Sequence, residues 1–148
     1  MTDSDTPLLE LEVENLIWRL QLSVPGSIEE IPGAVESILI ELRGMKCAEG
    51  EEHQVELVLN EALANAVVHG CQEDPRHEVH IAVGCDEDRG IVIVVRDPGK
   101  GFDPGEVPSP LVGERIFASH GRGIFLINEL MDHVRYRRGG TELWMRKK

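Results

Sequence analysis

The sequence predicts one α+β domain, a two-layer sandwich in which a mixed, mostly antiparallel sheet of about five strands carries three helices on one face. Three observations predict it. The chain has 148 residues, enough for a single sizeable core. Short stretches alternate between apolar and polar residues, as half-buried strands do. Longer stretches repeat apolar residues at the helical spacing.

The expected elements follow one another without an internal repeat. Residues 1–15 are polar and acidic, so we expect a flexible tail before a single domain over 16–148. Strands are expected at five places: 16–24, 79–83, 91–95, 134–138 and 142–146. Helices are expected at three: from a capping-box Ser27 to about 43, over 51–69, and over about 122–131. Between them, residues 98–120 are rich in proline and glycine and have no period, which indicates a functional lid at about 102–120.

Charge and cysteine content exclude several classes of protein. The net charge of -12 argues against a nucleic-acid or anionic-membrane binder, because both need a basic face. A C-terminal basic cluster is interpreted as a solvated edge hairpin (Arg135, Arg137, Arg138, Arg146, Lys147 and Lys148). Cys47, Cys71 and Cys85 form no CxxC pair, and we interpret them as free thiols in a cytoplasmic protein.

Three short patterns contain the residues able to do chemistry. Glu61, Asn65 and His69 are spaced four apart, so they share one face of the predicted helix. Taken alone, this pattern is more typical of a solvent-facing polar stripe than of a site. Asp97-Pro98-Gly99-Lys100-Gly101 directly follows an apolar strand, and this spacing also occurs in common turns. His120-Gly121-Arg122-Gly123 opens a helix, where free backbone N–H groups can bind phosphate.

In this order, the three patterns resemble the N, G1 and G2 boxes of the GHKL ATPase superfamily. Gly140-Thr141 in the last hairpin looks like the further G-T element of that superfamily, and the resemblance spans residues 51–148. The segments NEALANAVVHG and GRGIFLINELMD are most similar to those of the bacterial anti-sigma-factor serine kinases of partner-switching pathways. Sensor histidine kinases of the superfamily usually carry Asn where this chain has Glu61.

The resemblance implies a fold, two cofactors and a set of site residues. It implies a Bergerat ATP-binding fold that binds ATP with Mg²⁺, with Asn65 holding the metal and Asp97 reading the adenine. The further nucleotide-binding residues that it implies are Gly99, Gly101, Gly121, Arg122, Gly123 and Thr141. Lys100 and Arg122 can equally be solvated cations. Glu61 becomes the candidate catalytic residue, because a carboxylate at that place can accept a proton from a serine hydroxyl or a water.

The resemblance also implies partners, and three functions stay open. The first is a serine protein kinase that phosphorylates a STAS-domain antagonist and sequesters a sigma factor, with a homodimer suggested by the family. The second is a nucleotide-gated binding module with little kinase activity. The third is a stand-alone ATPase domain. Neither direct nucleic-acid binding nor a membrane location is expected.

Overall fold

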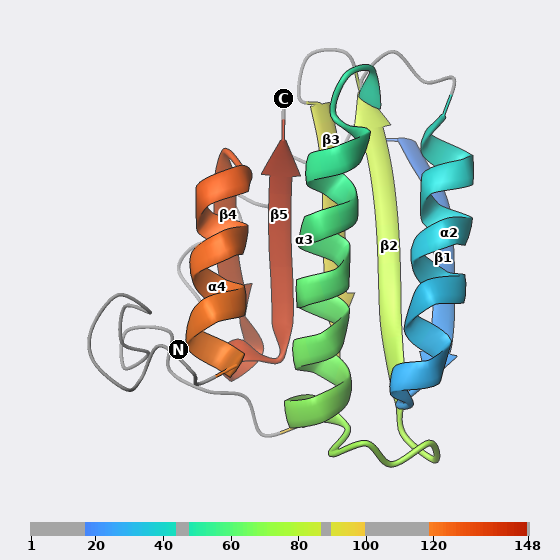
Figure 1. The fold of residues 1–148 in the computed structure, drawn as a ribbon, viewed down its shortest axis with the longest axis vertical. Helices are drawn as coiled ribbons and strands as arrows, with labels where there is room; N and C mark the ends of the chain where they lie inside the picture. The colour runs from blue at the N-terminus through green and yellow to red at the C-terminus, as the bar shows by residue number, and fades with distance from the viewer. Residues whose placement is uncertain (1–16, 44–47, 87–89, 100–118, 148) are drawn as a thin grey trace.

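The computed structural model describes residues 17–43, 48–86, 90–99 and 119–147. Five strands lie within them: β1 (Ile17–Pro25), β2 (Glu78–Asp86), β3 (Gly90–Arg96), β4 (His133–Arg137) and β5 (Glu142–Lys147). The helices of this described part are α2 (Ile31–Leu42), α3 (Glu52–Asn65) and α4 (Ser119–Leu130). Figure 1 shows the three helices side by side across one face of the sheet, with α3 in the middle. The predicted two-layer α+β fold is confirmed.

The strands form one sheet in the order β1-β2-β3-β5-β4. Each neighbouring pair is antiparallel, so the described strands contain none of the parallel pairing that a mixed sheet would have. β3 and β5 are adjacent although α4 and β4 separate them in sequence. This arrangement brings the end of β3 next to the β4–β5 turn, where two of the predicted motifs meet.

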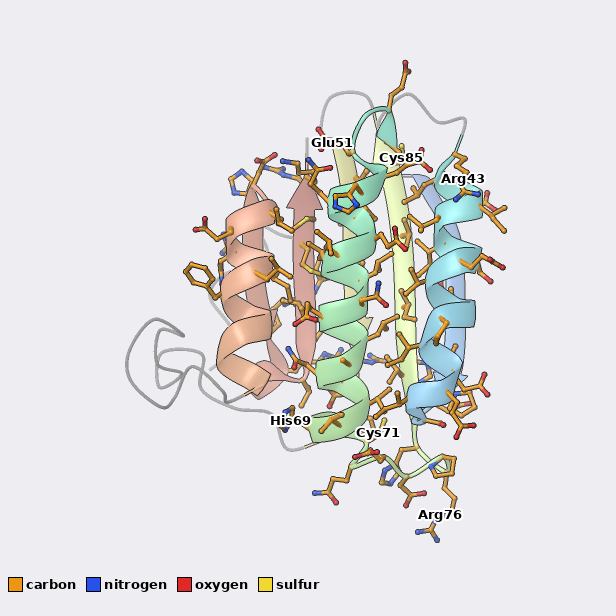
Figure 2. All side chains as sticks on the ribbon, in the orientation of Figure 1. Arg43, Glu51, His69, Cys71, Arg76 and Cys85 are labelled. Carbon is orange, nitrogen blue, oxygen red and sulfur yellow. The ribbon has the colours of Figure 1, made fainter. Side chains whose placement is uncertain are left out.

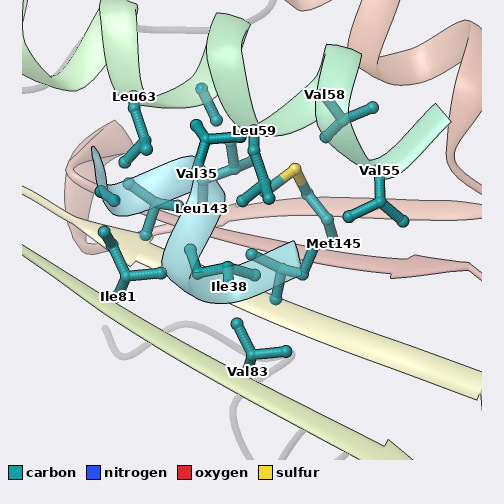
Figure 3. Packing of buried hydrophobic residues seen from close by; sticks show 14 of the residues in the cluster. Val35, Ile38, Val55, Val58, Leu59, Leu63, Ile81, Val83, Leu143 and Met145 are labelled. Atoms are coloured by element: carbon teal, nitrogen blue, oxygen red, sulfur yellow. The ribbon is translucent and has the colours of Figure 1, made fainter. Parts of the chain in front are cut away.

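The core lies between the helices and the sheet because the strands alternate. In β2, Val79, Ile81 and Val83 are buried beneath the helices, while His80 is exposed on the other face. Figure 3 shows the helix side chains that meet this face, among them Leu59 of α3. β3 is buried along nearly its whole length, as its unbroken apolar run predicts.

The start of the first helix differs from the prediction. Ser27 lies at the N-cap of a short 3-10 turn, η1 (Ile28–Glu30), and its side chain makes no capping hydrogen bond. The α-helix begins only at Ile31, so Pro32 occupies its first turn. Proline is tolerated there because the first amide groups of a helix have no partner within the helix. The proline therefore sets the start of α2, rather than the predicted cap.

The ends of two other helices also differ. The predicted helix over 51–69 divides into α3 and a five-residue π-helix, η3 (Ala66–Gly70). α4 begins at Ser119 instead of at about residue 122, so Gly121, Arg122 and Gly123 all lie inside its first turns. Gly101 and nearly all of the predicted lid at 102–120 lie outside the described residues.

The cysteine prediction is correct for Cys71 and wrong for Cys85. Cys71 is a free, buried thiol, and burial is the main reason that its pKa is raised. Cys85, at the end of β2, is disulfide-bonded. An odd number of cysteines still allows one pair, so the count does not support three free thiols. The cytoplasmic location stays a prediction. Among the described residues, no helix is both long and apolar enough to cross a bilayer.

Candidate functional site

A pocket opens where the C-terminal end of α3 meets the ends of the central strands. Its wall comes from α3 and η3, and its floor from β3, β4 and β5. The described residues that line it are Ala62, Asn65, Ala66, His69, Gly70, Val95, Asp97, Tyr136, Gly140, Thr141 and Leu143. Figure 2 labels His69 at this end of the helix layer. Asn65, Asp97 and Thr141, three of the predicted site residues, thus come together from distant parts of the chain.

The π-helix gives the wall of the pocket its shape. The amide of Cys71 donates to the carbonyl of Ala66 at 2.8 Å, one residue further back than an α-helical bond reaches. Such wide turns often occur at functional sites, since they redirect the side chains beyond them. Here the turn follows Asn65 directly and brings Gly70 to the end of β3.

Gly70 lies so close to Asp97 that no side chain fits between them. A Cβ atom on Gly70 would overlap the Asp97 carboxyl group and lie 2.6 Å from its Cβ. A Cβ on Gly99 would meet the Cα and carbonyl oxygen of Gly70, both at 2.8 Å. Real Cβ atoms do not approach other atoms this closely, so both positions need glycine. The two glycines let the helix end and the strand end touch around one carboxylate.

Asp97 is a half-buried carboxylate with little local compensation. Its Oδ1 accepts a hydrogen bond from the amide of Gly99 at 2.8 Å. Burial raises the pKa of Asp97 above its ordinary value of 3.8, and the bond from Gly99 opposes that rise. Among the described residues, no cation pairs with this carboxylate. A carboxylate that is partly withdrawn from water and has an unused acceptor oxygen is suited to a ligand that donates a hydrogen bond.

Thr141 is coupled to Asp97 through the backbone. The amide of Asp97 donates to the carbonyl of Thr141 at 3.0 Å, which extends the β3–β5 ladder past the last strand residue. The hydroxyl of Thr141 donates to the carbonyl of Arg138 at 2.9 Å, so it closes the β4–β5 turn. A backbone hydrogen bond therefore joins the predicted G-T element to the aspartate that is predicted to read the adenine.

Asn65 and Glu61 occupy different positions relative to the pocket. Asn65 is half-buried and lines it. Glu61, one turn earlier on α3, is also half-buried but is not among the described lining residues. For Gly121, Arg122 and Gly123 the described backbone gives only their place in the first turns of α4. The roles assigned to Glu61 and to these three residues stay predictions.

Eight of the eleven described lining residues are not among the predicted site residues, and His69, Gly70 and Tyr136 are three of them. The sequence favours a structural role for His69 and only a helix stop at Gly70, because no periodicity reveals a π-helix. Tyr136 could have been found, since strand alternation places it on the same face as Val134, and burial raises its pKa to about 12. The interpretation of the basic cluster is wrong in part: the side chain of Arg137 is 13% exposed and ion-paired, not solvated.

The sequence is similar to a known protein family and to several named bacterial proteins. Residues 24–147 match the family described as "Histidine kinase-like ATPase domain". The chain belongs to this family. It is 31% identical to "Serine-protein kinase RsbW" of Bacillus subtilis (strain 168), over 78% of this chain and 76% of that protein. It is also 29% identical to "Anti-sigma F factor" of Priestia megaterium and 31% identical to the protein of that name from Oceanobacillus iheyensis, each over 64% of this chain and 67% of the relative.

The pocket fits the nucleotide of an ATPase-family domain. Asp97 offers a shielded acceptor to an amine, and the backbones of Gly70 and Gly99 pack directly against it without side chains. Asn65 supplies an amide oxygen, a ligand type that Mg²⁺ accepts together with phosphate oxygens. No group of three or more His, Cys, Asp or Glu side chains within the described ranges could hold a metal alone. A magnesium ion here would therefore depend on the phosphates of the nucleotide.

Proposed function

We propose that this chain is an ATP–Mg²⁺-dependent serine protein kinase that also acts as an anti-sigma regulatory factor. The observation that supports this most is the half-buried Asp97 carboxylate, placed in one pocket with Asn65 and Thr141. The names of the relatives, a serine-protein kinase and anti-sigma F factors, support the same interpretation.

Asp97 selects the base of the nucleotide. Its free carboxylate oxygen accepts a hydrogen bond from the exocyclic amine of adenine, while Gly99 holds the other oxygen. Guanine presents a carbonyl at the equivalent place, and two acceptors facing each other repel. The site therefore prefers ATP to GTP. Thr141, whose carbonyl accepts from the Asp97 amide, keeps the strand end in position for this contact.

Asn65 holds the metal, and Glu61 acts on the nucleophile. When bound, Mg²⁺ neutralises phosphate charge and orients the phosphates of ATP. Glu61 lies one helical turn before Asn65, so its carboxylate faces the same side of α3. There it accepts the proton of the incoming serine hydroxyl. The first turns of α4, with Gly121, Arg122 and Gly123, and the G1-box Gly101 complete the binding of the phosphates.

The serine belongs to a partner protein. We propose a STAS-domain antagonist as the phosphorylated partner, a sigma factor as the sequestered target, and a homodimer as the working form. A nucleotide-gated binding module would bind ATP and partner without transferring phosphate. A stand-alone ATPase would hydrolyse ATP at its full rate with no partner present. Turnover measured with and without the STAS-type partner separates the three.

The metal assignment is tested by replacing the amide at Asn65. Asn65→Ala is expected to abolish measurable binding of ATP–Mg²⁺ in a calorimetric titration, because the metal loses its one protein ligand among the described residues. Asn60→Ala is the matched control: Asn60 lies on the same helix, and its side-chain amide donates to the Glu56 carbonyl at 2.9 Å. Wild-type affinity in Asn65→Ala would contradict the assignment.

The catalytic assignment is tested by neutralising Glu61. Glu61→Gln is expected to keep ATP binding and to slow phosphorylation of the STAS-type partner by roughly 10²-fold or more, the usual contribution of a general base. Glu56→Gln, which alters an exposed carboxylate on the same helix, should leave the rate unchanged. If Glu61→Gln transfers phosphate at the wild-type rate, the nucleotide-gated binding module becomes the better interpretation.

A further inference from the structure

A second shielded carboxylate, Glu142, lies behind the pocket on the face of the sheet that has no helices. Glu142 begins β5 directly after Thr141, and only 7% of its surface is exposed. It is the one polar or charged residue classed as buried among those that the structure describes. Burying a carboxylate is unfavourable unless donors and cations surround it, so its surroundings indicate what it does.

Donors and cations from three strands converge on Glu142. The indole N–H of Trp144 donates to its Oε1 at 2.9 Å. A guanidinium nitrogen of Arg137 lies 3.8 Å from the same oxygen. Arg138 and Arg96 approach Oε2 at 3.6 and 4.0 Å. Glu142 pairs in register with Arg96 of β3 on one side and with Arg137 of β4 on the other. It thus joins the strand ends that form the floor of the pocket.

Arg138 connects this cluster to the pocket through its hydrogen bonds with Thr141. Its φ is +53°, the left-handed region, which is unfavourable for a residue with a Cβ. Gly139 and Gly140 follow with φ of +68° and +97°. In this conformation the carbonyl of Arg138 accepts from the Thr141 hydroxyl at 2.9 Å and from its amide at 3.3 Å. The carbonyl of Thr141 in turn accepts from the amide of Asp97.

We propose that Glu142 is a positioning residue for nucleotide selection. Its ion pair holds Arg138 in the left-handed conformation, Arg138 fixes Thr141, and Thr141 fixes the backbone of Asp97. The cluster acts from the opposite face of the sheet and contacts no nucleotide. This inference rests on the proposed ATP-binding function, which it deepens: adenine selectivity depends on a salt-bridge cluster behind the pocket as well as on Asp97.

The test compares nucleotide affinities with global stability. In Glu142→Gln, Trp144 keeps an acceptor while the three arginines lose their anion. We expect about a tenfold weaker affinity for ATP–Mg²⁺ and a smaller ratio of GTP to ATP dissociation constants, measured well below the melting temperature. The Asp97 amide should also exchange faster with deuterium. A purely structural role would lower the melting temperature and leave this ratio unchanged. Glu129→Gln, an exposed carboxylate on α4, is the control.

Two substitutions of Arg138 test the mechanism without removing the buried carboxylate. Arg138 has a 62% exposed side chain, so the fold should tolerate its replacement. Arg138→Ala and Arg138→Asn both remove the cation, but asparagine adopts positive φ far more readily than alanine. We expect Arg138→Ala to weaken ATP binding about as much as Glu142→Gln does, and Arg138→Asn to stay near wild type. Added to Glu142→Gln, Arg138→Asn should restore most of the lost affinity and selectivity.

The outcomes separate this inference from the proposed function. If the wild-type chain binds no ATP, the proposed function fails first. If it binds ATP and prefers it to GTP, but Glu142→Gln and Arg138→Ala match the wild type in both respects, the positioning role is overturned. It is also overturned if Arg138→Ala and Arg138→Asn behave alike, because the conformation of Arg138 would then not transmit the effect.

Discussion

Asp97 and Glu142 are two carboxylates shielded from solvent at the same end of neighbouring strands, and they have opposite surroundings. Glu142 faces the side without helices and is surrounded by three arginines and an indole N–H. Asp97 faces the helices and accepts one backbone hydrogen bond, with no cation beside it among the described residues. Protein groups compensate the first carboxylate. The second lacks such compensation from the protein, and in our proposal a ligand provides it.

The contrast explains why the pocket sits where it does. Strand alternation sends Asp97 to one face and its neighbour Arg96 to the other, where Arg96 approaches Glu142. A single residue of register shift would exchange the two faces and place a cation in the pocket. The proposed preference for a ligand with an amine donor thus depends on the pairing of β3 with β5.

The largest effect is expected from filling the space beside Asp97. Gly70→Ala places a Cβ onto the carboxyl group, so Asp97 must move. We expect loss of measurable ATP binding in a titration and a destabilisation of about 1–3 kcal/mol, the usual result of overpacking. Gly33→Ala is the matched control, since a Cβ added to Gly33 in α2 would meet nothing within 4 Å and should slightly stabilise the chain. Unchanged ATP affinity in Gly70→Ala would show that the close approach is unimportant.

A smaller effect is expected from Asp97→Asn, which should weaken ATP binding without lowering the stability of the ligand-free chain. The amide keeps an oxygen for Gly99 but offers adenine a weaker, neutral partner, so ATP affinity should fall about 10- to 150-fold, the equivalent of a charged hydrogen bond. Stability should move the other way, because the variant no longer shields a poorly compensated charge from water. Without nucleotide, its melting temperature at neutral pH should equal or exceed that of the wild type.

The melting temperature of Glu142→Gln provides the comparison for that of Asp97→Asn. Removing the charge from Glu142 leaves three guanidinium groups without their shared anion, so that variant should be less stable than the wild type. If Asp97→Asn also lowers the melting temperature, the two carboxylates are both structural and the distinction between them is lost.

The sequence predicted the parts of this contrast that depend on local patterns. Alternation located the strands, and the D-x-G-x-G and G-T patterns located Asp97 and Thr141, which the structure brings together. The sequence could not predict that Gly70 lies against Asp97, because this contact depends on a π-helix over Ala66–Gly70. That π-helix lies within a continuous helical pattern. Nor could the sequence predict the pairing of Glu142 with Arg96, since the two residues are distant in the chain and only the β3–β5 register joins them.

The interpretation of the C-terminal basic cluster is wrong in part for a similar reason. A run of arginines beside glycines indicates a solvated hairpin when only neighbours in sequence are considered. In the structure Arg137 lies 5.4 Å from the ring centroid of Trp144 and also reaches Glu142. Such contacts form across strands, so they follow from the sheet rather than from the local sequence.

The smallest expected effect, a pH dependence, tests the electrostatic part of the comparison. Burial raises the pKa of Asp97 in the folded chain above the 3.8 of an exposed aspartate. The folded state therefore binds the proton more tightly than the unfolded state does. The resulting stability is fully present below the unfolded pKa and is lost as pH rises through the folded pKa. At neutral pH none of it remains, and the charged carboxylate is unfavourable unless a ligand donates to it.

Asp97→Asn serves as the reference for this measurement because titration of the ATP phosphates affects both proteins equally. As pH falls through the raised pKa of Asp97, the wild-type carboxyl becomes neutral like the amide. The advantage of the wild type in ATP affinity should then shrink, and the melting temperatures of the two ligand-free proteins should converge, beginning above pH 3.8. A constant affinity ratio down to about pH 4, close to the ordinary pKa of an aspartate, would show that Asp97 is not the under-compensated acid inferred from its surroundings.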